Sequence, residues 1–155
     1  MSKAHERQDF TDLLSSKRGL MYLTPNDWTL LADKAKRMQF KSGEAIVQKG
    51  KRTQGVFLLL NGSARVQLPI RLRESVPAIG AGEVCGEISF IDDLPATATV
   101  QALEPVEAFY LERSVLQGLF ELFPHLGSRF YRSLASSLSR RLRELIDTEA
   151  SAKPT

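Results

Sequence analysis

The chain has 155 residues, 43% of them hydrophobic and 25% charged, with a formal net charge of +3 at pH 7. This composition predicts one globular domain, leaves no room for a second, and gives only a weak indication of a polyanionic partner. A single cysteine excludes an internal disulfide. The polar N-terminus lacks a signal-peptide core, and no apolar run approaches the roughly 20 residues that span a bilayer. We therefore expect a cytoplasmic protein without a membrane segment.

The first expected elements are a short helix or arm within residues 1–23, followed by a well-marked helix. Phe10, Leu13 and Leu14 have helical spacing in the arm. Thr24 supplies a capping hydroxyl, Pro25 suits the first helical position, and Asp27 is an acid in the first turn. The apolar stripe predicted for this helix is Trp28, Leu31, Ala32, Ala35 and Met38.

From Met38 to Leu111 the apolar period changes to two, which indicates short strands separated by glycine-containing turns. Asn61 and Gly62 have the chemistry of a tight hairpin turn. Many short strands favour a small antiparallel barrel or jelly roll over residues 24–112, within an α+β fold.

Two helices are expected after the strands. The first begins at Ser114, and Pro124 ends or kinks it. The second runs from about His125 to Asp147, so that residues 113–148 form a hinge and a long helix, and residues 149–155 a frayed tail. Its stripe has 4-3-4-3 spacing over two heptads, which fits either a coiled-coil seam or packing on the chain's own barrel: Tyr131, Ala135, Leu138, Leu142 and Leu145.

Residues 86–100 are the most informative segment. Gly86 permits close approach of the backbone to a ligand, and the acid Glu87 follows directly. A short helical turn from Ile88 to Ile91 would expose unpaired amide groups to an anion. After the turn at residues 92–95, the residues Thr97, Thr99 and Val100 indicate a strand.

This segment resembles the phosphate-binding cassette of the cyclic nucleotide-binding domain family. Gly86, Glu87, Pro95, Thr99 and Val100 match the cassette pattern, and residues 40–50, 56–66 and 79–83 resemble the family's first hairpin, a later hairpin and the turn before the cassette. The resemblance implies that Glu87 accepts a hydrogen bond from a ribose 2′-hydroxyl. It also implies a candidate site made of Gly86, Glu87, Ile88, Ser89, Ala96, Thr97 and Ala98.

The sequence departs from the family at the position that binds the cyclic phosphate, where Ala96 replaces arginine. An arginine fork makes two charge-assisted bonds of roughly 1.5–3 kcal/mol each, so its loss costs roughly two to four decades of affinity. Arg71 and Arg73 are candidate substitutes for the missing charge. Cys85 replaces an aromatic residue and is interpreted as a small packing residue.

Other polar residues favour structural roles. Asp92 and Asp93 precede a Leu-Pro pair and are expected to form a turn, while His5 and His125 have no partner at metal-ligand spacing. We therefore predict no metal, no cofactor and no catalytic group. A solvated basic face is the preferred interpretation of Arg129, Arg132, Arg140, Arg141 and Arg143.

Two functions remain open. The first is a non-enzymatic regulatory module that binds ordinary cAMP or cGMP weakly and acts through contacts with an unidentified effector protein. The second is a receptor for a cyclic nucleotide or cyclic dinucleotide with non-standard phosphate contacts. The family resemblance also implies a homodimer through the final helix, and the sequence ends almost where the DNA-binding domain of the family's transcription factors would begin, so we expect none.

Overall fold

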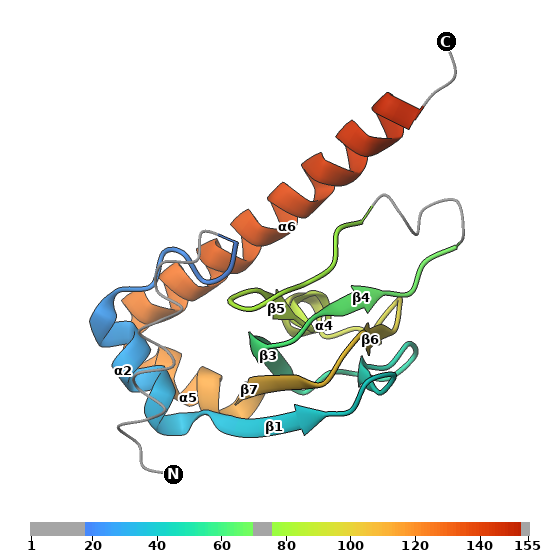
Figure 1. The fold of residues 1–155 in the computed structure, drawn as a ribbon. Coiled ribbons are helices and arrows are strands. Elements are labelled where there is room, and N and C mark those ends of the chain that lie inside the picture. The colour runs from blue at the N-terminus through green and yellow to red at the C-terminus, as the bar shows by residue number, and fades with distance from the viewer. Residues whose placement is uncertain (1–17, 70–75, 153–155) are drawn as a thin grey trace.

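Two antiparallel sheets and a set of helices make up the computed structural model, which describes residues 18–69 and 76–152 (Figure 1). One sheet has the strand order β1-β7-β3-β5 and the other has the order β2-β6-β4. The predicted jelly-roll fold with flanking helices is confirmed, although the two sheets do not close into a barrel. The elements are α2 (Pro25–Lys34), β1 (Lys36–Phe40), β2 (Ala45–Val47), β3 (Gly55–Asn61), β4 (Ala64–Val66), β5 (Val84–Cys85), α4 (Glu87–Asp92), β6 (Val100–Ala102), β7 (Val106–Glu112), α5 (Arg113–Leu122) and α6 (Pro124–Ala152).

Helix α2 begins as its sequence predicts. The Asp27 amide donates to the Thr24 hydroxyl over 3.1 Å, and the Thr24 amide donates to the Asp27 carboxylate over 3.0 Å, which forms a capping box. Trp28, Leu31 and Ala32 are buried as expected. The prediction that Met38 belongs to this stripe is wrong. The helix ends before Ala35, whose backbone is extended, and Met38 lies exposed in strand β1. The short helix expected before residue 15 lies outside the described residues.

The two predicted hairpins are wrong, because the strands on either side of each turn belong to different sheets. Strand β3 pairs with β5 and β7, whereas β4 pairs with β6, so the turn at Gly62 crosses between sheets. Strands β1 and β2 are separated in the same way. Gly62 has a φ of +87°, and a Cβ there would lie 2.3 Å from the Pro105 carbonyl oxygen. The turn chemistry predicted a reversal, but not the partner of each strand.

The described residues form two hydrophobic cores, and strand β3 contributes to both because its successive side chains point to opposite faces of the sheet. Val56 and Leu58 face the helices and join the cluster that includes Phe109 of β7, Phe130 of α6 and buried residues of α2 and α5. Phe57 and Leu59 face the second sheet and join the cluster between the sheets. The first core fixes α6 against the sheet that carries the cassette.

Helix α6 is longer than predicted. The preceding helix ends before Pro124, as predicted, because α5 stops at Leu122, and Pro124 is the first residue of α6, where a missing amide hydrogen costs nothing. The helix continues to Ala152, so residues 149–152 are helical and not the expected frayed tail. Its C-terminal part projects beyond the sheets (Figure 1). Within the described parts of the chain, no helix is both long enough and apolar enough to cross a membrane.

Candidate ligand-binding site

The cassette is a tight turn followed by a short helix. Gly86 has a φ of +85°, and a Cβ on it would lie 3.2 Å from the Gly55 carbonyl oxygen, so a larger residue would be strained. Helix α4 then runs for 6 residues to Asp92, as expected, and the left-handed Asp93 ends it. The strand predicted to include Thr97 and Thr99 begins later, at Val100.

A cavity of about 310 Å³ lies beside α4, between the second sheet and α6. All seven residues named from the cassette line it: Gly86, Glu87, Ile88, Ser89, Ala96, Thr97 and Ala98. Most of its remaining wall is aliphatic and comes from the sheets, the preceding connection and α6: Val47, Val66, Leu68, Val76, Ile79, Val100, Leu138, Leu142 and Leu145. The predicted helical stripe thus contributes three residues to this wall.

Glu87 is bound by an arginine of the chain's own final helix. One Nη atom of Arg141 donates to Glu87 Oε1 over 2.5 Å, and the other donates to the Val84 carbonyl oxygen over 2.6 Å. Glu87 is 3% exposed. Burial raises the pKa of the Glu87 carboxyl, and the charge of Arg141 opposes this shift. Glu87 and Arg141 therefore form a buried ion pair at the edge of the cavity.

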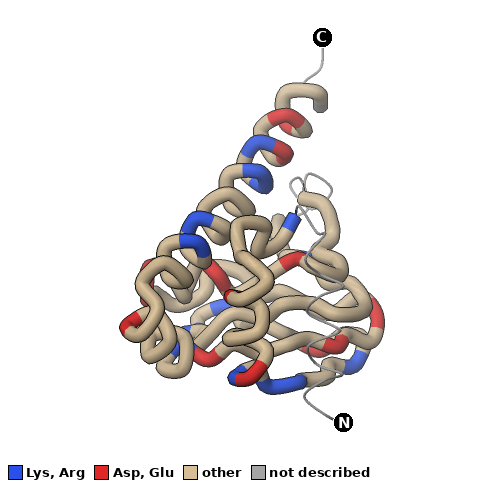
Figure 2. Tube along the Cα trace, turned by 90° about the vertical axis from the view of Figure 1, so that its left-hand side faces the viewer, with Lys and Arg blue, Asp and Glu red and all other residues tan. Residues whose placement is uncertain are grey.

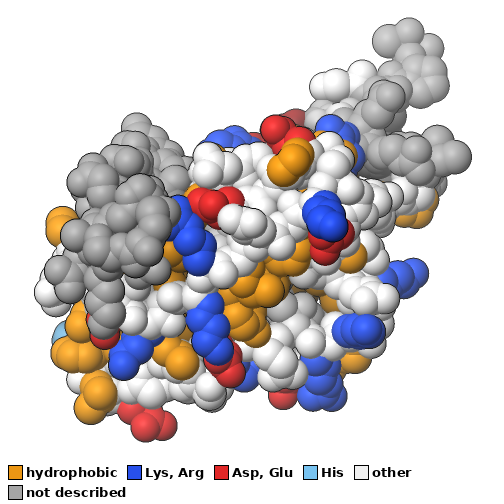
Figure 3. Space-filling view, turned by 60° about the horizontal axis from the view of Figure 1, so that its bottom comes forward, with side chains coloured by type: hydrophobic (Ala, Val, Ile, Leu, Met, Phe, Trp, Pro, Cys, Tyr) orange, Lys and Arg blue, Asp and Glu red, His pale blue; other side chains and the backbone are white. Residues whose placement is uncertain are grey.

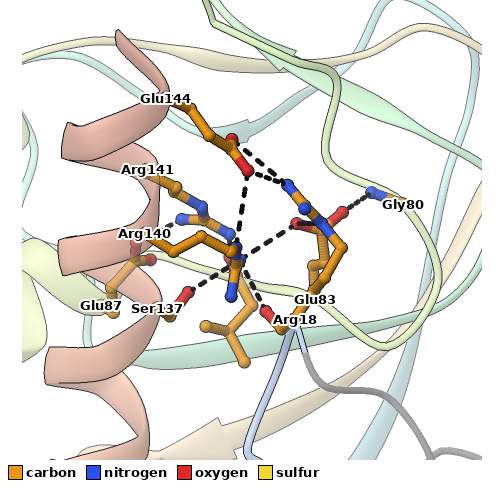
Figure 4. A network of polar contacts seen from close by, with 9 residues as sticks. Arg18, Gly80, Glu83, Glu87, Ser137, Arg140, Arg141 and Glu144 are labelled. Carbon is orange, nitrogen blue, oxygen red and sulfur yellow. Dashed lines mark hydrogen bonds and ion pairs between the residues drawn. The ribbon is translucent and has the colours of Figure 1, made fainter. Parts of the chain in front are cut away.

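A second network lies next to this pair on the same helix (Figure 4). Arg140 and Arg18 reach the same oxygen of Glu83, over 3.5 and 3.3 Å, and the Gly80 amide donates to its other oxygen over 2.8 Å. Arg18 also pairs with Glu144 over 3.0 Å. Burial lowers the pKa of the Arg140 guanidinium. Consecutive arginines of α6 thus hold Glu83 and Glu87 on either side of β5.

The solvated basic face that the sequence suggested for α6 is correct only in part: Arg132 and Arg143 are exposed, whereas the other three arginines bind acidic side chains of the chain itself. Besides Arg140 and Arg141, Arg129 pairs with the buried Asp27 over 2.7 Å, and Arg132 lies over the ring of Tyr22 at 4.0 Å. Basic and acidic residues are interleaved along the helix (Figure 2). On the face seen in Figure 3, basic side chains lie among acidic and hydrophobic ones and form no single patch. The predicted apolar stripe of α6 is largely exposed, and the residues of this helix that pack in the core are Leu126, Phe130 and Leu134, which the heptad spacing did not predict.

Ala96 leaves the cassette without a charged side chain where the family pattern has arginine. Its amide donates to the Lys51 carbonyl oxygen over 2.9 Å, and its own carbonyl accepts from the Gly50 amide over 2.8 Å. The backbone at Ala96 is therefore held by the connection at residues 50 and 51. Arg141 supplies the single Lys or Arg side chain among the described residues of the cavity wall. The proposed substitutes Arg71 and Arg73 lie outside the described residues.

The remaining polar candidates have structural partners. The Leu94 amide donates to the Asp92 carboxylate over 3.0 Å, and Asp93 pairs with Arg52 over 3.5 Å, which agrees with turn formation. Cys85 is fully buried, and burial raises the pKa of its thiol. Across residues 18–69 and 76–152, no group of three or more His, Cys, Asp or Glu side chains could hold a metal ion.

Comparison with known proteins decides the family. The model of the cyclic nucleotide-binding domain matches residues 37–122, more than half of the chain. The chain belongs to the cyclic nucleotide-binding domain family. This cyclic nucleotide-binding domain is 29% identical over 124 residues to the cyclic AMP receptor protein of Thermus thermophilus, covering 79% of this chain and 56% of that protein. It is 26% identical over 125 residues to cyclic GMP-binding protein C of Dictyostelium discoideum, covering 79% of this chain and 5% of that protein.

Solved structures share the fold of this domain. A cyclic nucleotide-binding domain from Methylobacillus flagellatus superimposes with a TM-score of 0.81 at 22% identity, covering 96% of this chain and 86% of that one. The regulatory subunit of a cAMP-independent protein kinase A from Trypanosoma cruzi, bound to guanosine, superimposes with a TM-score of 0.62 at 23% identity. The match covers 73% of this chain and 40% of that one. The chain spans between 5% and 56% of the curated relatives named above.

Proposed function

We propose that this domain is a non-catalytic regulatory module of the cytoplasm that does not hold cAMP or cGMP tightly and acts through protein contacts. The observation that carries the proposal is the ion pair between Glu87 and Arg141. The carboxylate that would receive the ribose is bound by the chain's own helix, and Ala96 leaves the cassette no cation for the phosphate.

The magnitudes favour weak binding of cyclic nucleotides. Without the arginine fork, affinity falls by roughly two to four decades. Arg141 replaces it only by leaving Glu87 and Val84, and breaking a buried ion pair costs about 3–5 kcal/mol. One new pair with a phosphate returns roughly 1.5–3 kcal/mol per bond. Moving Arg141 from Glu87 to a bound phosphate therefore adds little or nothing to the free energy of nucleotide binding.

Titration calorimetry with cAMP and cGMP tests the proposal directly. We expect no saturable heat at ligand concentrations below about 100 μM, which corresponds to a binding free energy weaker than about −5.5 kcal/mol. The domain's folded state is checked by circular dichroism in the same buffer. A dissociation constant in the micromolar range for either nucleotide would contradict the proposal.

The protein contact that we propose first is a homodimer through α6. Tyr131 and Leu142 are 41% and 57% exposed, and with Ala135 they leave much of the stripe open on the described chain. Native mass spectrometry is expected to find twice the 17.3 kDa mass at micromolar concentration. Leu142→Glu should shift the species to the single mass, and Leu103→Glu, on an exposed loop, should not. A wild-type chain of single mass would refute the dimer.

The alternative is a receptor for a cyclic nucleotide or cyclic dinucleotide that draws positive charge from elsewhere. Arg141 lies at the cavity wall and is the observation that favours it. Arg71 and Arg73 are further candidates by sequence. If a panel of such nucleotides bound, Arg71→Ala with Arg73→Ala and, separately, Arg141→Ala would show which cation is used. Unchanged affinity in both variants would remove this alternative.

A further inference from the structure

The two charges at the cavity cancel each other. Arg141 donates to Glu87 over 2.5 Å and to the Val84 carbonyl oxygen over 2.6 Å, while Glu87 is almost completely buried. Among the described residues of the cavity wall, an anion that enters must remain without a cation among aliphatic side chains, or must take Arg141 and strand a buried carboxylate. A neutral ligand faces neither cost, because it leaves the pair intact.

The cavity retains groups that recognise a sugar hydroxyl and a flat apolar ring. An ionised carboxylate offers about four lone-pair sites, so the bond from Arg141 leaves Glu87 able to accept from a hydroxyl. Thr97 adds a hydroxyl at the rim. The aliphatic wall suits a nucleobase, and 310 Å³ is at the lower end of the roughly 300–1,000 Å³ typical of small-molecule sites.

We propose that the cavity binds a neutral ribonucleoside, with a ribose hydroxyl on Glu87 and the base against Val66, Ile79 and Leu142. This inference rests on the proposed function, because it takes the loss of the phosphate contact as given and names what the site binds instead. The Trypanosoma cruzi structure with guanosine has the same fold and holds a nucleoside that carries no phosphate. The base is held partly by α6, so the nucleoside bridges the cassette and the final helix.

Calorimetry and thermal shift with matched compounds test this ligand class. Adenosine, guanosine, cytidine and uridine are compared with cAMP and cGMP, and 2′-deoxyadenosine reports the hydroxyl contact. We expect adenosine or guanosine to bind at least tenfold more tightly than its cyclic phosphate. Removing the 2′-hydroxyl from adenosine should weaken its binding by about tenfold, in line with the loss of a hydrogen bond to a charged group.

Ala96→Arg sharpens the test by returning the family's cation to the cassette. It should raise the ratio of cAMP affinity to adenosine affinity by at least about a hundredfold, as expected for a restored arginine fork. Leu103→Arg adds the same charge on an exposed loop away from the cavity and should leave the ratio unchanged. Urea unfolding of both variants establishes that they fold.

The outcomes separate this inference from the function on which it rests. If no nucleoside binds at millimolar concentration and the cyclic nucleotides also fail, the inference is overturned while the proposed function stands. If cAMP binds the wild-type domain in the micromolar range and more tightly than adenosine, both are overturned. If the ratio of cAMP affinity to adenosine affinity is the same in Ala96→Arg as in wild type, the inference that the missing arginine makes the cavity select nucleosides is also overturned.

Discussion

Two carboxylates are each held by an arginine of α6, yet their surroundings differ. Asp27 accepts two bonds from Arg129, over 2.7 and 2.8 Å, and a third from the Thr24 amide. Burial opposes ionisation there, but these hydrogen bonds lower the pKa of Asp27 overall. At Glu87 burial prevails over the charge of Arg141, and the pKa is raised. A carboxylate with a full set of donors stabilises the fold, whereas a buried one with fewer donors beside a cavity is suited to a ligand.

Removing the cation from the Glu87 pair should have the largest effect. Arg141→Leu leaves a buried carboxylate without its arginine, and we expect the free energy of unfolding to fall by about 3 kcal/mol in urea denaturation at pH 7. Adding Glu87→Leu to this variant should restore most of the loss, because an apolar pair of similar volume replaces a buried ion pair at little cost. A loss below about 1 kcal/mol in the single variant would show that Glu87 does not depend on Arg141.

The Asp27 pair should be less sensitive, because its arginine is partly exposed. Asp27→Ala removes one half of the capping box of α2, and we expect a loss of about 1–2 kcal/mol in the same urea measurement. Glu121→Ala, an exposed acid on α5, is the matched control and should stay within about 0.5 kcal/mol. If Asp27→Ala cost more than Arg141→Leu, the ranking of the two pairs would be reversed.

Changes of pH should affect the two pairs in opposite directions. The native pKa of Asp27 lies below its ordinary value of 3.8, so its contribution is present above that value and is lost as the pH falls through the native pKa. The native pKa of Glu87 lies above 4.5, so the native state holds its proton more tightly and stability declines as the pH rises from 4.5. Urea unfolding from pH 3 to 8 of Asp27→Asn and Glu87→Gln, each subtracted from wild type, should give difference curves of opposite slope. Two curves of the same slope would contradict the assignment.

The smallest effect should come from the outer network. Arg18→Ala removes the ion pairs with Glu83 and Glu144, but the Arg18 side chain is 44% exposed, so solvent screens these pairs. We expect a loss below about 1 kcal/mol, which should shrink further in high salt. A loss equal to that of Arg141→Leu would show that the outer network, and not the Glu87 pair, holds α6.

The periodicity and local chemistry of the sequence predicted much of the fold, but they did not predict which residues bind the arginine side chains of α6. Capping by Thr24, the short helix after Gly86 and the missing cation at Ala96 are local features that residues within a few positions determine. The partners of Arg129 and Arg141 depend on how α6 crosses the sheet, which no local pattern specifies. The prediction of strand pairing failed because pairing also depends on distant residues. Gly62 determines that the chain turns, but not which sheet each of the flanking strands joins.

The adjacent arginines 140 and 141 also determine where α6 can rest along its own axis. They meet Glu83 and Glu87, which lie on opposite sides of β5. A shift of α6 by about one turn in one direction would bring Glu144 opposite Glu83, and a shift in the other would bring Ser136 there. The first shift places like charges together, and the second leaves Glu87 without its cation and Glu83 with Arg18 alone. The two ion pairs of Arg140 and Arg141 therefore oppose a four-residue slide of α6 along its axis in either direction.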